Sequence, residues 1–235
     1  KDALKVVLGG LKRLEYRGYD SAGVAFFDDV SKSIQIIKRQ GRISVLESAL
    51  SRKKSAYIAT TIGHTRWATH GSPSDINAHP HFDCRKEIAI AHNGIIENHG
   101  IIRDALLREG HKFSSATDTE VISHLIERSL KQGARSFEDA FREAIRHLEG
   151  TFGIVAVSNK FPNLMLASRR GSPLLLGIGK NEYLVASDAS AVREYTKRVI
   201  YLDDNEIVSI TPQSYRIFDL SNHNRQKTPS IIEWS

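Results

Sequence analysis

The chain has 235 residues, of which 40% are hydrophobic, and a formal charge of +6 at pH 7, so it can bury a sizeable core as one large domain or two small ones. No run of about 18 apolar residues and no basic-then-apolar leader occurs, and Lys and Arg are spread in short pairs, so we expect neither a membrane nor a nucleic-acid partner. The single cysteine excludes an internal disulfide framework and is typical of a cytoplasmic protein.

The first two thirds of the chain mix helical and strand patterns. In chain order we expect a helix at 2–14, strands at 22–27 and 34–38, a short helix on Ile43, Leu46 and Leu50, strands at 57–62 and 87–91, and helices at 99–109, 118–132 and 136–148. Thr117 and Glu120 have the spacing of a capping box at the start of the second of the last three helices.

From Phe152 onward the pattern changes to strand after strand. We expect strands at 152–158, 163–168, 173–178, 182–186, 199–202, 206–211 and 214–219, with one helix around Ala189–Tyr195. Because strict βαβ alternation is absent, the fold class is α+β with layered antiparallel sheets. The polar stretch after residue 220 predicts a domain at 1–220 and a linker at 221–235 that leads toward a further domain.

The stretch HTRWATHG (64–71) follows the strand expected at 57–62, and histidines are numerous nearby. His64, His70, His79, His81 and His92 could bind zinc, which takes three or four such ligands. No two of them have the i, i+4 spacing of a helical zinc motif, however, and Pro80 separates His79 from His81. We therefore expect no metal and no other cofactor.

Arg66 and Trp67 in the same stretch favour a substrate clamp. The planar guanidinium of Arg66 suits a carboxylate, and Trp67 offers a large rigid lid. The alternative is a surface ion pair for Arg66 and a core position for Trp67. Together with other polar groups, the pair could hold one end of an amino acid.

Asn93 and Gly94 follow the strand expected at 87–91. A side-chain amide and a backbone N–H that converge there would make an oxyanion hole, although Asn-Gly is also a favoured turn dipeptide. Asp118, at the head of a predicted helix, either favours the helix dipole or binds an ammonium group. Arg66 for an α-carboxylate, Asp118 for an α-ammonium and Asn93 with Gly94 for a side-chain carbonyl would describe a glutamine pocket.

Five segments carry a family resemblance: RLEYRGYDSAG (13–23), HTRWATHG (64–71), NAHPH (77–81), HNGIIENH (92–99) and TDTEV (117–121). In order and spacing they resemble the glutaminase domain, of class II glutamine amidotransferase type, of the glutamine–fructose-6-phosphate aminotransferases. Amidophosphoribosyltransferases share the general arrangement of such a domain but usually lack this combination of motifs. The resemblance implies an N-terminal-nucleophile hydrolase fold, a four-layer αββα sandwich of two antiparallel sheets.

The same resemblance implies an activity and a set of partners. Glutamine would be hydrolysed to glutamate, and the ammonia would pass to a C-terminal sugar isomerase domain that binds fructose 6-phosphate, in a homodimer of the full-length protein. Asn93 and Gly94 would form the oxyanion hole, and Arg17 and Gly18 would border the nucleophile. Arg66 and Asp118 would grip the substrate, Trp67 would sit on a mobile loop, and Thr69, His70 and His79 would line the pocket.

The chain departs from the family at its start. Family members begin with Cys-Gly-Ile after removal of Met, and that cysteine attacks glutamine with its own α-amino group as base. This chain begins at Lys1, so we expect the nucleophile upstream of Lys1 and expect the chain as given to be inactive. Cys84 has no α-amino group and is interpreted as an ordinary small residue near a strand end. The alternative functions are a non-catalytic glutamine-binding sensor and the glutaminase domain of another class II amidotransferase, such as amidophosphoribosyltransferase.

Overall fold

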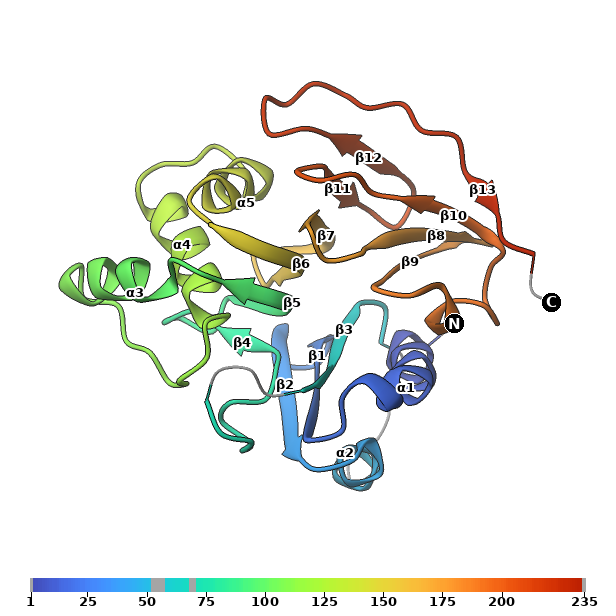
Figure 1. Ribbon diagram of the computed structural model, residues 1–235, viewed down its shortest axis with the longest axis horizontal. Coiled ribbons are helices and arrows are strands. Elements are labelled where there is room, and N and C mark those ends of the chain that lie inside the picture. The colour runs from blue at the N-terminus through green and yellow to red at the C-terminus, as the bar shows by residue number, and fades with distance from the viewer. Residues whose placement is uncertain (1, 52–57, 68–70, 234–235) are drawn as a thin grey trace.

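A computed structural model describes residues 2–51, 58–67 and 71–233 (Figure 1). The helices are α1 (Ala3–Leu14), α2 (Ile43–Leu50), α3 (His99–Arg108), α4 (Glu120–Lys131) and α5 (Phe137–Arg146), with short 3-10 helices η1 (Glu15–Arg17) and η2 (Ala189–Ala191). The strands are β1 (Ser21–Asp28), β2 (Ser33–Gln40), β3 (Thr61–Arg66), β4 (His81–Phe82), β5 (Ile88–Ile96), β6 (Gly150–Ser158), β7 (Phe161–Arg170), β8 (Leu175–Gly179), β9 (Glu182–Ala186), β10 (Arg198–Tyr201), β11 (Ile207–Ile210), β12 (Tyr215–Phe218) and β13 (Ser230–Ile231).

The described strands form three antiparallel sheets. The largest has six strands in the order β12-β11-β7-β6-β5-β4, and the other two have the orders β2-β1-β3 and β13-β10-β8-β9. β3 and β9 are therefore edge strands of two different sheets. Both smaller sheets face the six-stranded sheet, so together they form a second β layer.

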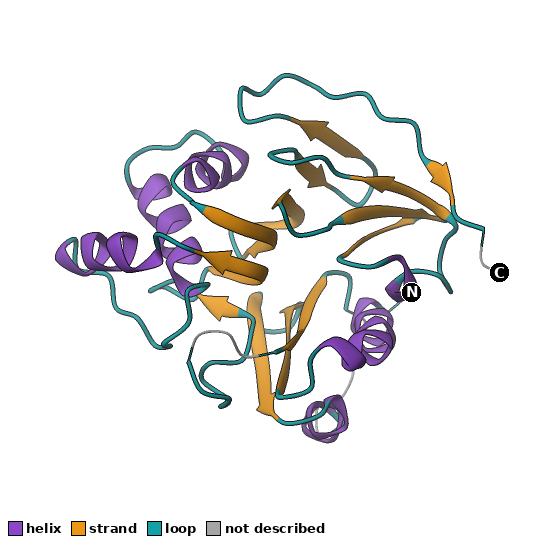
Figure 2. Cartoon of the chain, viewed as in Figure 1, coloured by secondary structure: helices purple, strands orange, loops and turns teal. Residues whose placement is uncertain are grey.

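Helices cover the outer faces of the six-stranded sheet and of the β2-β1-β3 sheet, as the purple and orange ribbons of Figure 2 show. α3, α4 and α5 pack on the six-stranded sheet around a core that includes Phe137, Phe141 and Phe152. α1 and α2 pack on the β2-β1-β3 sheet through Leu11 and Leu46. Burial of these apolar side chains on both faces of each β layer is the main stabilising contribution. The predicted α+β, four-layer αββα order is confirmed, with the second β layer made of two sheets.

Two strands extend beyond the predicted ones, into the polar motifs. The strand expected at 57–62 was placed too early, since β3 begins at Thr61 and continues to Arg66; Tyr57 lies outside the described residues. Pairing with β1, from Phe26↔Thr61 to Ser21↔Arg66, draws these polar residues into the sheet. Likewise β5 continues to Ile96 through pairing with β6, so the interpretation of Asn93 and Gly94 as post-strand loop residues was wrong.

Two further local predictions were wrong. The helix expected at 189–195 is only the 3-10 turn η2, capped by the side chain of Asp188. The capping box of α4 does not form: the carboxylate of Glu120 accepts from the backbone N–H groups of Ser114 and Ser115 instead. The preceding loop supplies these donors, and they draw Glu120 toward the loop.

Residues 221–233, the segment predicted as a linker, contact both β layers, since Asn224 forms a bridge with Phe218 of β12. β13 pairs with β10, and the ammonium of Lys227 contacts Asp203 and Glu206 at 2.7 and 2.6 Å. The division at residue 220 stays a prediction. Over the described ranges, each helix is too short or too polar to cross a membrane.

Candidate active site

A cavity of about 780 Å³ lies against β3, β5, β9 and α1. The predicted site residues that line it are Arg17, Arg66, Trp67, His79, Asn93, Gly94 and Asp118. They come from five separate places in the fold, among them the ends of β3 and β5 and the segment before α4. The fold therefore gathers motifs that are as far as a hundred residues apart in sequence into one concave surface, where binding sites usually occur.

Arg66 and Asp118 provide opposite charges at this cavity. Both side chains are buried, at 4% exposure each. The guanidinium of Arg66 donates to the carbonyl oxygen of Gly71 at 3.0 Å, and Asp118 Oδ2 accepts from the backbone N–H of Ile96 at 2.8 Å. Burial lowers the pKa of Arg66, whereas the carboxylates of Asp20 and Asp118 raise it. The two fixed charges suit a zwitterionic ligand.

Asn93 of β5 is oriented by a histidine of β3, a strand of the facing sheet. His64 Nε2 lies 2.7 Å from Asn93 Oδ1. Because an amide oxygen only accepts, Nε2 must carry the proton, and the Asn93 Nδ2 group is left to donate elsewhere. Burial lowers the pKa of His64 to about 4, so the ring is neutral near pH 7. The His64–Asn93 bond thus fixes the amide with its donor end available.

Gly94 occupies a backbone conformation that other residues rarely adopt. Its φ is +123°, and an added Cβ would overlap the carbonyl oxygen of Thr151 on β6. A glycine here lets β5 approach β6 closely while its backbone turns away from regular strand geometry. This change of direction occurs directly after Asn93, beside the cavity.

Neutral histidines surround one hydroxyl at the base of the cavity. Thr119 Oγ1 lies 3.1 Å from His79 Nε2 and 3.0 Å from His92 Nδ1. A second hydroxyl, Thr117 Oγ1, contacts His81 Nε2 at 3.1 Å. Burial lowers the pKa of each of the three rings, which keeps them uncharged at neutral pH.

These histidines do not converge as metal ligands. The ring centroids of His64 and His79 are 4.3 Å apart with an interplanar angle of 31°, and His79 and His92 are nearly parallel at 14°. In these pairs the faces of the imidazole rings oppose one another, and the ring nitrogens do not point at a common centre. His70 lies outside the described residues, so the five-histidine hypothesis is tested only in part.

The remaining predicted residues are placed unevenly. Arg17 lines the cavity and pairs with Asp188 at 2.7 Å, whereas Gly18 lies behind it, where an added Cβ would meet the Arg66 carbonyl carbon at 2.8 Å. Trp67 is 61% exposed and packs edge-on against Tyr19, so the core alternative for Trp67 was wrong. Thr69 and His70 lie outside the described residues.

Sequence reasoning missed two residues that organise this cavity. His64 was noted only as a possible metal ligand, and Thr119 was given no role, although its hydroxyl joins two histidines. The TDTE motif (117–120) could have indicated a role for Thr119, since it places a hydroxyl next to Asp118. Only the packing of one β layer on the other could show that His64 of β3 contacts Asn93 of β5.

The four-layer sandwich with a polar cavity at the edge strands of its β layers defines the class as an N-terminal-nucleophile hydrolase fold. Among solved structures, the chain resembles the glutamine phosphoribosylpyrophosphate amidotransferase from B. subtilis, complexed with ADP and GMP. The TM-score is 0.79 at 25% identity, over 95% of this chain and 48% of that one. A glutamine aminotransferase class-II domain protein from Silicibacter pomeroyi is similar in fold, with a TM-score of 0.57 over 86% of this chain and 91% of that one at 17% identity.

A family model described as a glutamine amidotransferase domain matches residues 64–194, more than half of the chain. The chain belongs to the glutamine amidotransferase family. It is 44% identical to the glutamine–fructose-6-phosphate aminotransferase (isomerizing) of Chlorobaculum tepidum, over all of this chain and 38% of that protein. The corresponding protein of Thermococcus kodakarensis is 48% identical over 92% of this chain and 35% of its own length. The chain thus spans little more than a third of these relatives.

Proposed function

We propose that this chain is the glutamine-hydrolysing part of a glutamine–fructose-6-phosphate aminotransferase. The observation that carries the proposal is the His64–Asn93 bond of 2.7 Å, which leaves an amide donor available beside a cavity that also holds a buried arginine and a buried aspartate. A pocket with these three groups matches the chemistry of glutamine: a carboxylate, an ammonium and a carbonyl that must accumulate negative charge.

Arg66 and Asp118 bind the amino-acid end of glutamine in this proposal. The guanidinium of Arg66 donates hydrogen bonds to the α-carboxylate, and the carboxylate of Asp118 accepts hydrogen bonds from the α-ammonium. Because both side chains are buried and anchored to backbone groups, little further ordering is needed on binding. His79 supports this wall through Thr119, the neighbour of Asp118.

Asn93 and Gly94 act on the side-chain end of glutamine. When a thiolate attacks the amide carbon, the carbonyl oxygen becomes an oxyanion, and Asn93 Nδ2 with the Gly94 backbone N–H would donate to it. The α-amino group of the attacking cysteine, which took the thiol proton, returns it to the departing nitrogen, and the intermediate collapses to a thioester and ammonia. Water then attacks the thioester, which yields glutamate and restores the thiol. His64 stays neutral throughout and holds the amide, which makes it a positioning residue.

The nucleophile in this proposal is the thiol of a cysteine upstream of Lys1, as the family resemblance implies. Two edge strands support its placement: residues of β3 and of β9 both line the cavity, and each strand has one unpaired side among the described strands. An extended segment between them would join the two smaller sheets through backbone hydrogen bonds. Its first residue would lie at the cavity near Arg17, and Trp67 would cover the bound substrate.

The relatives' names suggest the use of the ammonia. By analogy, a sugar isomerase domain of the same natural protein would take fructose 6-phosphate and form glucosamine 6-phosphate, with two copies in a homodimer and residues 221–235 as the connection. The amidophosphoribosyltransferase alternative is less well supported, because its identity is 25% against 44% for the hexosamine relative.

Glutamate release from glutamine by the natural full-length protein tests the proposal. We expect Asn93→Ala to lower kcat by about 10²–10³-fold with a small change in KM, the effect of losing one oxyanion donor. Asn163→Ala, which alters an exposed asparagine of β7 at the same cavity, serves as the matched control and keeps kcat.

Two outcomes would count against the proposal. Calorimetric glutamine binding without glutamate release would indicate the non-catalytic sensor. An Asn93→Ala variant with unchanged kcat would remove the amide from the mechanism.

A further inference from the structure

A second cluster of chemically reactive side chains lies away from the cavity, where α4 meets the turn between β4 and β5. Cys84 of that turn, His111 after α3, and His124 and Glu127 of α4 each point one ligand atom at a common centre, and these atoms lie within 4.8 Å of one another. His124 and Glu127 are three residues apart, so they share one face of the helix.

Five distances between these atoms match the edges of a tetrahedron around a zinc ion. With zinc–nitrogen bonds of about 2.0–2.1 Å and a zinc–sulfur bond of about 2.3 Å, the edges are about 3.3 Å for N–N or N–O and about 3.6 Å for N–S. His111 Nδ1 and His124 Nδ1 are 3.1 Å apart. Glu127 Oε2 lies 3.2 Å from His111 Nδ1 and 3.5 Å from His124 Nδ1. Cys84 Sγ lies 3.6 Å from His111 Nδ1 and 3.4 Å from His124 Nδ1.

Neighbouring groups orient the ligand atoms from outside. The other carboxylate oxygen of Glu127, Oε1, contacts Lys131 at 2.7 Å, so Oε2 remains directed at the centre. The far nitrogen of His124 faces Glu120 Oε1 at 3.6 Å, the arrangement in which a carboxylate supports a ligating histidine. The backbone N–H of Lys112 donates to Cys84 Sγ at 3.3 Å, which favours a thiolate.

We propose that Cys84, His111, His124 and Glu127 bind one zinc ion as a closed, four-ligand structural site. Two imidazoles, a thiolate and a carboxylate in tetrahedral arrangement select zinc over magnesium or calcium, which prefer oxygen ligands in larger numbers. Cys84 loses its thiol proton to water when the ion binds. The site is separate from the histidines of the cavity and reverses the expectation that the protein holds no metal.

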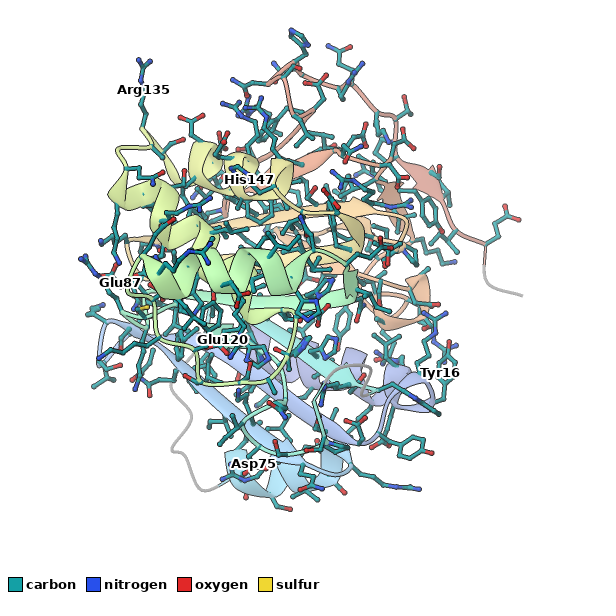
Figure 3. All side chains as sticks on the ribbon, turned by 60° about the vertical axis from the view of Figure 1, so that its left-hand side comes forward. Tyr16, Asp75, Glu87, Glu120, Arg135 and His147 are labelled. Atoms are coloured by element: carbon teal, nitrogen blue, oxygen red, sulfur yellow. The ribbon has the colours of Figure 1, made fainter. Side chains whose placement is uncertain are left out.

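The ion would cross-link three segments that are distant in sequence. It would tie the β4–β5 turn and the start of the α3–α4 connection to the middle of α4. α4 begins beside Asp118 and Thr119, which line the substrate cavity. Cys84 is exposed whereas the other three ligands are buried, so an ion can enter from the solvent at the sulfur side. Figure 3 shows Glu120 at the start of α4, clearly separated from His147 at the end of α5.

Cobalt substitution in the natural full-length protein, prepared without a histidine tag and kept reduced, tests the site. One equivalent of Co²⁺ should give visible bands of tetrahedral cobalt together with a near-ultraviolet thiolate charge-transfer band, and one equivalent of Zn²⁺ should abolish both. Cys84→Ser should lose the charge-transfer band. His147→Gln, which changes an exposed histidine that also contacts a carboxylate, should keep it.

Zinc should also raise the Tm of the unaltered protein by about 5 °C or more, since an ion that binds only the folded state stabilises it. The proposal is overturned if the unaltered, folded protein takes up no stoichiometric cobalt or shows no charge-transfer band. A band that survives in Cys84→Ser would overturn it equally. Because the spectrum of the unaltered protein decides by itself, a variant that fails to fold leaves the test intact.

Discussion

Two groups of buried histidines lie along α4 and differ in what surrounds them. At the start of the helix, His64, His79 and His92 contact an amide and a hydroxyl, and their ring faces oppose one another. Further along, His111 and His124 direct the same ring nitrogen at one point, with a thiol and a carboxylate beside them. The residue type is the same, and the partners determine its chemistry.

The difference shows what a neutral buried imidazole can contribute. With a neutral partner it has one donor and one acceptor, so it fixes the orientation of an amide or a hydroxyl. With thiol and carboxylate partners its lone pair becomes a ligand. The cavity histidines, His64, His79 and His92, therefore orient the groups that bind substrate, whereas His111 and His124 suit a metal ion.

Acidification should lower the stability of the folded protein mainly through the histidines of the cavity. These rings are buried and neutral, with pKa values below the ordinary 6.5, whereas the unfolded chain protonates its histidines near 6.5. Stability is therefore fully present above pH 6.5 and is lost as the pH falls, at up to about 1.4 kcal/mol per pH unit for each ring. For His64, whose pKa is about 4, the total is about 3 kcal/mol.

Urea unfolding between pH 7.5 and 4.5 checks this, with His64→Leu as the comparison, because that variant should lose less stability across the same interval. A free energy of unfolding that is flat between pH 6.5 and 5 would contradict neutral burial of these rings.

Removal of the His64 ring should impair catalysis without impairing binding. We expect His64→Leu to lower kcat for glutamine hydrolysis by roughly 10²-fold, because the Asn93 amide is then free to rotate away from the oxyanion. KM should change less than a few-fold, since Arg66 and Asp118 are untouched. His147→Leu is the control. A rise in KM at constant kcat would assign His64 to substrate binding instead.

Removal of the Thr119 hydroxyl should cost a smaller amount of stability. Thr119→Val keeps the shape but leaves nitrogens of His79 and His92 without their hydroxyl contact, at a cost of about 2 kcal/mol. Thr119→Ser retains the hydroxyl and should recover most of that free energy. Urea unfolding at pH 7.5 measures both; equal stability of the valine and serine variants would show that the hydroxyl is dispensable.

Trp67 should have the smallest effect on stability. Its side chain is 61% exposed and touches Tyr19, so Trp67→Ala should change the free energy of unfolding by less than about 1 kcal/mol. Because Trp67 would cover the bound substrate, the Trp67→Ala variant should nevertheless have a KM for glutamine that is several-fold higher. An unchanged KM would separate Trp67 from the substrate pocket.

Much of the fold followed from periodicity, because helix and strand patterns reflect burial directly. The three helices α3, α4 and α5 were predicted within two residues at each end. The ends of β3 and β5 were misplaced because polar residues follow the apolar run of each strand: His64 and Asn93 face a cavity, and pairing with β1 and β6 holds them in the strands. Local sequence carries no information on that pairing.

The site could be predicted in composition but not in geometry. Arg66, Asn93, Gly94 and Asp118 were found from residue chemistry and resemblance, and the structure places all four at one cavity. The cluster around Cys84 escaped notice, since its members lie up to 43 residues apart and only two share a helix face. A metal site assembled by tertiary contacts has no spacing motif to recognise.

A crystal structure of the full-length protein with bound glutamate would test the central claim most directly. We predict the α-carboxylate at the Arg66 guanidinium, the α-ammonium at Asp118, and a γ-carboxylate oxygen within about 3 Å of Asn93 Nδ2. Glutamate bound with its γ-carboxylate at Arg66, or outside the cavity altogether, would contradict the account.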